Sequence, residues 1–224
     1  MSDALKQEAM KYVKENKTLL FETYLDNHTP LEKKMAFFTA GPSGAGKTEF
    51  AQKLLDLQSD LVHLDIDRTR EFFHTVGYDG SNSNIFQTPA GRGMQYLFDE
   101  IVKQRGLSVL LDSNLSHLQT AQENMVKLVK NGYSIEIFYI YNHIEKCFLY
   151  TKERESVTKR VVPEDVFFNS IVKSRETTCK IKQLFEDDIV LNVIDKRENR
   201  HYENISSDEF INIVPELIAE SKND

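Results

Sequence analysis

The chain has 224 residues, of which 40% are hydrophobic, and its formal net charge is −7 at pH 7. This length and apolar content predict one domain with a substantial core, and the acidic balance disfavours broad electrostatic binding to nucleic acid or to an anionic membrane. The two cysteines and six histidines form no zinc-binding pattern. The N-terminus has no signal-peptide core, and no apolar stretch is long enough to cross a bilayer. We therefore expect a cytoplasmic protein with free thiols at Cys147 and Cys179.

The chain opens with a helical pattern. Apolar residues recur at roughly helical spacing over 3–25, and the run Asn27-His28-Thr29-Pro30 breaks that pattern. We expect one or two helices before the first strand of the core.

A strand, a glycine-rich loop and a helix follow in direct succession. The apolar run 35–40 predicts a buried parallel strand. Residues 41–48 read G-P-S-G-A-G-K-T, which fits the P-loop pattern at every fixed position, and 49–55 continue as an amphipathic helix. A glycine-rich turn can match this pattern by chance, but the strand before it and the helix after it favour a phosphate-binding loop.

The chemistry of this loop is specific. Gly41, Gly44 and Gly46 can adopt backbone angles that are closed to other residues, and the helix N-terminus directs positive charge at an anion. Lys47 is predicted to reach the β- and γ-phosphates, and the Thr48 hydroxyl is predicted to help hold Mg²⁺. The predicted nucleotide-binding residues are Gly41, Pro42, Ser43, Gly44, Ala45, Gly46, Lys47, Thr48 and Glu49.

Strands and helices alternate through the rest of the chain. In order, the patterns predict a strand over 60–67, a turn-rich loop over 77–91, a helix over 94–105 closed by Gly106, a strand over 107–112, a helix over 118–129, a strand over 133–141, helices over 143–155 and 163–186, a strand over 188–195, and a last helix after the capping box at 206–209 that Pro215 limits. This alternation predicts an α/β fold, a P-loop NTPase-type three-layer sandwich with a central parallel sheet flanked by helices.

Carboxylates stand where two of these strands end. Ligands of such sheets bind beyond the carboxyl ends of the strands, which is where Asp65, Asp67 and Asp112 are expected. Strand alternation predicts that Asp65 and Asp67 point to the same side. An acid after the P-loop helix is typical of small-molecule kinases, where it accepts the proton of the attacking hydroxyl. We favour Asp67 for that role, whereas Asp65 serves as readily to cap a helix at 68–74.

Other nucleotide-binding classes fit less well. The chain has neither the D-x-x-G nor the N-K-x-D element of GTPases, and Ser113, not Glu, follows the strand that ends at Asp112, unlike the paired acids of many ATPases. A binding module that only senses ATP would need no acids at the strand ends. A kinase of a nucleoside, a metabolite or a polynucleotide end remains open. A basic cluster fits that last substrate or a lid over ATP equally well: Lys152, Arg154, Lys159, Arg160, Lys173 and Arg175.

The ordered set G-P-S-G-A-G-K-T, L-D-I-D-R-T-R, L-L-D-S-N and K-R-V-V-P resembles the zeta toxin family over roughly residues 30–185. The resemblance implies a toxin of a toxin–antitoxin system that uses ATP and Mg²⁺ to phosphorylate a hydroxyl of UDP-N-acetylglucosamine, and that a small antitoxin protein blocks at the nucleotide site. We expect a single kinase domain over 1–224, made of an N-terminal helical segment (1–30), a core (31–195) with a lid over about 150–186, and a C-terminal helical segment (196–224).

The resemblance also assigns roles to individual residues. It implies that Lys47 and Asp67 are catalytic, together with the lid arginine Arg160, which clamps the transferring phosphate. Arg154 is a second candidate that would contact the nucleotide, and Arg175 is another. The residues implied to bind the acceptor are Asp65, Arg70, Asp112 and Asn114.

The chain departs from the family pattern at two places. Phe73-His74-Thr75 stands where His-Pro is common, and Asp112 stands where Glu is common. One methylene changes the reach of a carboxylate enough to matter for a positioned contact, so the identity of the sugar nucleotide stays open. Two further predictions concern other parts of the chain. Tyr78 and Phe86 are candidates to stack on a base. Segment 1–30 either packs on the sheet edge, or docks an antitoxin or acts as a built-in inhibitor.

Overall fold

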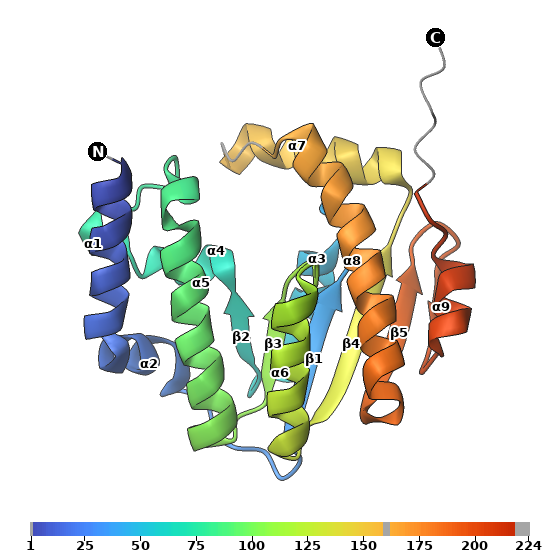
Figure 1. Ribbon diagram of the computed structural model, residues 1–224, viewed down its shortest axis with the longest axis horizontal. Helices are drawn as coiled ribbons and strands as arrows, with labels where there is room; N and C mark the ends of the chain where they lie inside the picture. Colours follow the sequence, from blue (N-terminus) through green and yellow to red (C-terminus); the bar gives the residue numbers. More distant parts are fainter. Residues whose placement is uncertain (1, 159–161, 218–224) are drawn as a thin grey trace.

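The computed structural model describes residues 2–158 and 162–217. Within these ranges six strands form one sheet in the order β2-β3-β1-β4-β5-β6 (Figure 1). The strands are β1 (Met35–Ala40), β2 (Val62–Asp65), β3 (Val109–Asp112), β4 (Ser134–Tyr141), β5 (Ile189–Asp195) and β6 (Arg200–Tyr202). All neighbours pair in parallel except β6, which pairs antiparallel with β5. The predicted parallel sheet is confirmed; the short strand β6 was not predicted.

The predicted order of helices is confirmed as well. The helices are α1 (Ser2–Glu15), α2 (Lys17–Leu25), α3 (Lys47–Leu57), α4 (Ile66–Glu71), α5 (Ser83–Glu100), α6 (Leu118–Lys130), α7 (Ile144–Thr158), α8 (Glu164–Phe185) and α9 (Ser207–Ile213). Gly106 ends the helical run after α5 in a left-handed conformation, and the capping box between Ser206 and Glu209 starts α9 as expected. Of the helices described, none is long and apolar enough to traverse a lipid bilayer.

The sheet is the middle of three layers. Successive side chains along its strands point to opposite faces, so both faces are apolar and each is covered by helices. Phe37 and Leu110 face one side, where they pack with Ala51 of α3. The next residues along the same strands, Phe38 and Leu111, face the other side, where α5, α6 and α8 cover the sheet (Figure 1). The larger core lies on this second side. The predicted three-layer arrangement is therefore confirmed.

Helices α1 and α2 are part of the core. Ala9, Val13, Leu20 and Leu25 are completely buried, and the two helices lie against α5 at the β2 end of the molecule (Figure 1). The inner face of segment 1–30 therefore has a structural role, as the packing interpretation predicts. Docking of a partner on its outer face stays a prediction.

The boundary between β2 and α4 differs from the prediction. The strand ends at Asp65, and Asp67 already lies in the first turn of α4. The Asp65 carboxylate accepts a hydrogen bond of 3.1 Å from the Asp67 N–H and so caps the helix. The expectation that the strand carries Asp65 and Asp67 on one side is wrong, and the capping interpretation of Asp65 is confirmed.

The turn-rich loop predicted over 77–91 is shorter than expected, because α5 begins at Ser83. Its first turns contain Pro89, a residue that breaks most helices. Phe86 and Ala90 lie one helical turn apart, and both are completely buried in the core. Burial of this apolar stripe outweighs the local preference of proline for loops.

Candidate functional site

The glycine-rich loop joins β1 to α3 at the carboxyl edge of the sheet. Its glycines are required by geometry. A Cβ on Gly41 would lie 2.2 Å from the Ile140 carbonyl oxygen, and one on Gly44 would lie 2.0 Å from that of Cys147. Gly46 has a φ of +95° and is the N-cap of α3. The loop therefore packs tightly against the end of β4 and against α7, and it wraps the N-terminus of α3, where backbone N–H groups favour an anion.

The Lys47 side chain is folded back onto its own loop. Only 8% of the residue is exposed, and its Nζ donates to the carbonyl oxygens of Pro42 (2.7 Å) and Gly41 (3.0 Å). Burial lowers the pKa of Lys47 to about 8, although the charge of Asp112 acts in the opposite direction. The loop thus holds a partly desolvated ammonium group at its beginning.

A row of polar side chains crosses the neighbouring strand ends. The register of β2 and β3 places Asp65 beside Asp112, and the Thr39 hydroxyl of β1 donates to Asp112 Oδ1 at 2.7 Å. Burial acts to raise the pKa of Asp112, but His63, Thr39 and the charge of Lys47 together lower it. The pKa of Asp65 is raised, chiefly by burial and then by the neighbouring carboxylates. Asp112 is therefore the more firmly ionised of the two acids.

Thr39 gives a direct test of this arrangement. Its hydroxyl also accepts the Ser113 N–H at 3.0 Å, so Thr39→Val leaves both a partly buried carboxylate and a partly buried N–H with one partner fewer. We expect the free energy of unfolding to fall by about 1–3 kcal/mol at neutral pH. Because the hydroxyl lowers the pKa of Asp112, its contribution is full above about pH 4 and is lost as the pH falls through the lower folded value.

Urea denaturation of wild type, Thr39→Val and Thr39→Ser at several pH values measures this effect. The serine variant keeps the hydroxyl and should lose only the small contribution of one methyl group. Equal losses in the two variants, or a loss in Thr39→Val that does not shrink on acidification, would contradict the role of the hydroxyl.

Asp67 is surrounded by arginines from two helices. Arg70, only 2% exposed, donates to Asp67 Oδ1 and also to the side-chain oxygen of Gln87 on α5. Arg154 of α7 donates to Asp67 Oδ2 at 3.4 Å. The charge of Arg154 also helps to lower the pKa of Lys47, so the cations of α7 and of the loop repel each other. Helices α3, α4, α5 and α7 therefore converge on one charged site.

The remaining predicted site residues lie in different places. The Asn114 carbonyl oxygen accepts the Gly41 N–H at 3.4 Å, which puts the segment after β3 against the start of the loop. Thr48 and Glu49 are exposed in the first turn of α3. Arg160 falls outside the described residues. Arg175 lies elsewhere: it donates to the Val214 carbonyl oxygen at 2.6 Å.

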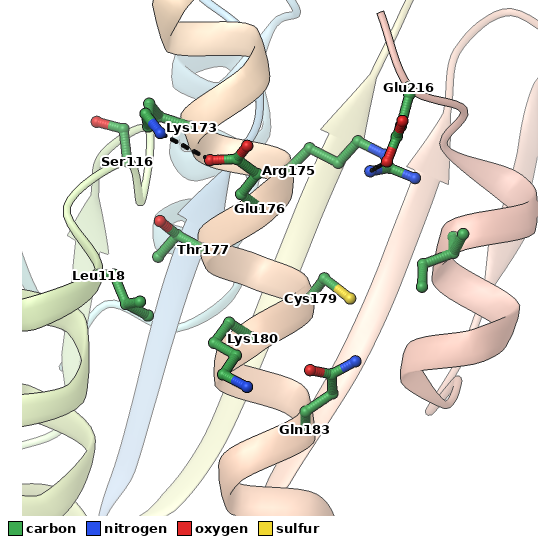
Figure 2. Close-up of a pocket in the computed structure, with 11 residues that line it drawn as sticks. Ser116, Leu118, Lys173, Arg175, Glu176, Thr177, Cys179, Lys180, Gln183 and Glu216 are labelled. Carbon is green, nitrogen blue, oxygen red and sulfur yellow. Dashed lines mark hydrogen bonds and ion pairs between the residues drawn. The ribbon is translucent and has the colours of Figure 1, made fainter.

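Arg175 lines a separate groove of about 490 Å³ beside α8 (Figure 2). There its guanidinium group pairs with Glu216 at 3.3 Å, and Lys173 pairs with Glu176 at 2.8 Å. Arg175 is held by the C-terminal segment, so it is not part of the charged site. The prediction that Phe86 stacks on a base is also wrong. Its ring is fully buried and packs against the Tyr78 ring, with the two ring centres 5.4 Å apart.

Three residues of the site were missed from the sequence. Thr39 lies one residue before the end of β1. The alternating direction of side chains along that strand is a signal that could have placed it beside the acids at the neighbouring strand ends. His63, with Nε2 3.9 Å from Asp112 Oδ2, follows from alternation in the same way. Gln87 gave no signal, because the start of α5 was misplaced.

The oxygen atoms near the loop suit a hard cation that is bound jointly by the protein and by a phosphate ligand. Among the described residues, no three His, Cys, Asp or Glu side chains gather into a metal site of their own. The Thr48 hydroxyl and the ionised Asp112 offer oxygen atoms near the loop, which fits Mg²⁺, an ion that takes only one or two protein ligands and completes its shell with water and phosphate.

The sequence also matches the model of a known protein family. The family model for zeta toxins matches residues 18–207 of the chain. No curated protein matches the sequence.

Several solved structures share the fold. One, from work on the PezAT chromosomal toxin–antitoxin system of Streptococcus pneumoniae, has a TM-score of 0.67 and 18% identity, over 98% of this chain and 91% of that one. The AvrRxo1-ORF1:-ORF2 structure with ATP has a TM-score of 0.66 and 12% identity, over 98% and 74%. A putative kinase from Chloroflexus aurantiacus has a TM-score of 0.50 and 17% identity, over 62% and 76%. At these identities the likeness establishes the fold.

Proposed function

Because this chain belongs to the zeta toxin family, we propose that it is an ATP-dependent kinase that phosphorylates a hydroxyl of UDP-N-acetylglucosamine or a related sugar nucleotide, as the toxin of a toxin–antitoxin system. The observation that carries the proposal is the position of Asp67, held by Arg70 and Arg154. It directly follows the end of β2, where Asp65 lies beside Asp112, and Asp112 accepts a hydrogen bond from Thr39 of the strand that leads into the loop. A P-loop alone binds a nucleotide, whereas an acid held in the same charged site gives an acceptor hydroxyl a base.

The loop residues 41–49 bind the polyphosphate of ATP through backbone N–H groups and the N-terminus of α3. The Lys47 ammonium turns from its own carbonyls to the β- and γ-phosphates. Thr48 helps to hold Mg²⁺, which supplies positive charge against the phosphate oxygens when it is bound.

Asp67 is the proposed general base. The acceptor hydroxyl gives its proton to the Asp67 carboxylate, the acceptor oxygen forms a bond to the γ-phosphorus, and the bond from that phosphorus to the β–γ bridging oxygen breaks to release ADP. Arg70 is buried and bonds to Asp67, so it fixes the position of the carboxylate. Asp112 and Asn114 at the end of β3, with Asp65 at the end of β2, are proposed to bind the acceptor.

Helix α7 is the proposed start of a lid over 150–186. Arg154 reaches across from α7 to Asp67, so a small movement of this helix brings its guanidinium to the transferring phosphate. Arg160 is proposed to act beside it. Cations in that place stabilise the charge that spreads over the phosphoryl oxygens in the transition state.

An antitoxin is the proposed protein partner. The structures with a similar fold come from a toxin–antitoxin system and from an ORF1:ORF2 complex. A partner that covers the mouth of the loop 41–49 would exclude ATP and so keep the enzyme inactive.

The alternative is a kinase of a different acceptor, such as a nucleoside, another metabolite or a polynucleotide end. The chain carries Asp112 where a longer acid is common in the family, and this shorter side chain favours an acceptor that reaches deeper into the site. A non-catalytic ATP-binding module fits less well, because it gives no reason for the Asp67–Arg70 pair.

A phosphate-transfer assay tests the proposal. Purified protein with ATP and Mg²⁺ is given UDP-sugars, nucleosides and oligonucleotides in parallel, and each product is identified by mass. We expect a mass gain of one phosphate on a UDP-sugar. Transfer only to another acceptor supports the alternative, and ATP binding without any transfer contradicts both kinase proposals.

A further inference from the structure

The turn that follows β5 brings a second lysine to the loop. The side chain of Lys196 reaches the end of the glycine-rich loop, where its Nζ lies 3.4 Å from the Gly46 carbonyl oxygen. A Cβ on Gly46 would lie only 1.9 Å from this Nζ. The absence of a side chain at Gly46 is therefore what gives the Lys196 ammonium its place beside the N-terminus of α3.

The backbone around Lys196 is held firmly. Its N–H donates to the Tyr141 carbonyl oxygen at 2.8 Å. The residue before it, Asp195, is 1% exposed and pairs with Arg197 at 2.7 Å. Arg197 also lies over the Tyr141 ring, 4.1 Å from its centre. With fixed residues on both sides, Lys196 has little freedom except in its side chain, which points to the loop.

The charge balance at this place favours an anion. The hydrogen-bond partner of Lys196 is a neutral carbonyl group. The Glu49 carboxylate shares this place, because its Oε2 would lie 3.2 Å from a Cβ on Gly46, and it offsets part of the positive charge of the two lysines. Cations are unfavourable at a helix N-terminus, yet Lys47 and Lys196 both place their ammonium groups against the loop that leads into α3. A bound polyanion converts this unfavourable arrangement into a favourable one.

The ammonium groups of the two lysines contact opposite ends of the loop. Lys47 contacts its beginning, at Gly41 and Pro42, whereas Lys196 contacts its end, at Gly46. The P-loop lysine reaches the β- and γ-phosphates, and the backbone of the loop cradles the α- and β-phosphates. We propose that Lys196 is a further nucleotide-binding residue, which donates to the α-phosphate end of the polyphosphate from the β5 side. This inference rests on the proposed use of ATP at the same loop.

Titration calorimetry with ATP and with ADP tests the inference in the full chain. Lys196→Ala should weaken both ligands by a similar factor of about ten, the usual size of one charge-assisted contact. Lys196→Arg keeps the charge and should recover most of the affinity. The control is Lys53→Ala, which removes an exposed lysine from α3, the helix that follows the loop, and should leave both affinities unchanged.

Two outcomes would overturn the inference. A loss for ATP with no loss for ADP would place Lys196 at the γ-phosphate and not at the α end. Unchanged affinity for both ligands, with a lower melting temperature, would mean that Lys196 only stabilises the Gly46 carbonyl. Because the readout is binding, a wild-type protein that binds ATP but transfers no phosphate would refute the proposed function and still test Lys196.

Discussion

Replacing Asp67 with asparagine is expected to lower kcat for phosphoryl transfer by about 100- to 10,000-fold, the range in which positioned general bases contribute. Asparagine has nearly the same shape and still accepts a hydrogen bond from Arg70, but it cannot take up the proton of the acceptor hydroxyl. ATP binding should change by less than a factor of about three, because the proposed contacts of the loop backbone and Lys47 with the phosphates do not involve Asp67.

The measurement is steady-state kinetics with the acceptor identified in the transfer assay, together with ATP binding by calorimetry. Asp56→Asn is the matched control: it neutralises an exposed carboxylate on α3 and should leave kcat unchanged. Removal of the charge beside the buried Arg70 also destabilises the fold, so kinetics are run well below the melting temperature of each variant.

The split between kcat and KM decides the role of Asp67. A fall in kcat with an unchanged KM for ATP supports the base. A raised KM for ATP with an unchanged kcat would mean that Asp67 and Arg154 only shape the nucleotide site. An unchanged kcat and KM would remove Asp67 from the mechanism.

The layered architecture was predictable because its signals are local. The apolar runs of β1, β3, β4 and β5 lie between helical patterns, and parallel strands buried on both faces read as continuous apolar segments. The loop 41–48 was predictable for the same reason: its spacing fixes glycines where the backbone needs them and a lysine at the start of a helix.

The errors arise where tertiary contacts decide between local preferences. Asp65 can continue a strand or cap a helix, and the sequence offers both; the structure selects the cap because the chain turns away from β2 directly after it. Pro89 suggests a loop, but burial of Phe86 and Ala90 keeps that segment helical. The misplacement of α5 hid Gln87, whose contact with Arg70 joins residues 17 positions apart.

The proposed acceptor side of the site was harder to predict than the proposed nucleotide side. Nucleotide binding uses the backbone of one continuous loop, so one motif identifies it. The proposed acceptor site uses single side chains from β2, β3, α4 and α5, whose partners depend on how these elements pack. This is why Lys47 was assigned from its motif, whereas Gln87 and Thr39 entered the site only with the structure.

Replacing Lys47 with methionine should abolish transfer and, at neutral pH, stabilise the ligand-free fold. Loss of this donor is expected to cost at least about 100-fold in kcat, as for other charge-stabilising groups in the transition state. Burial lowers the pKa of Lys47 from the ordinary lysine value of 10.5 to about 8, so holding the ammonium in the folded protein costs about 3 kcal/mol at pH 7. Methionine avoids that cost but loses the bonds to Gly41 and Pro42, worth about 1 kcal/mol each. The expected net gain is about 1 kcal/mol.

The sign of the pH dependence separates this effect from ordinary repacking. Between the folded and the unfolded pKa of Lys47 the unfolded chain binds more protons, so the stability of the wild type rises with pH in that window. From pH 7 to pH 9.5 the difference between Lys47→Met and wild type should therefore shift by about 2 kcal/mol against the variant. Lys53→Met, at an exposed position on the same helix, should show no such shift.

Urea denaturation at the two pH values, with and without ATP, measures both parts of the prediction. ATP should stabilise the wild type in proportion to the logarithm of its concentration, and it should stabilise Lys47→Met far less. A variant that is less stable than wild type at pH 7, with no change in the difference at pH 9.5, would mean that the buried ammonium carries no desolvation cost. In that case the two hydrogen bonds of Lys47 to the loop would outweigh the cost of burying its ammonium group, and Lys47 would stabilise the ligand-free fold.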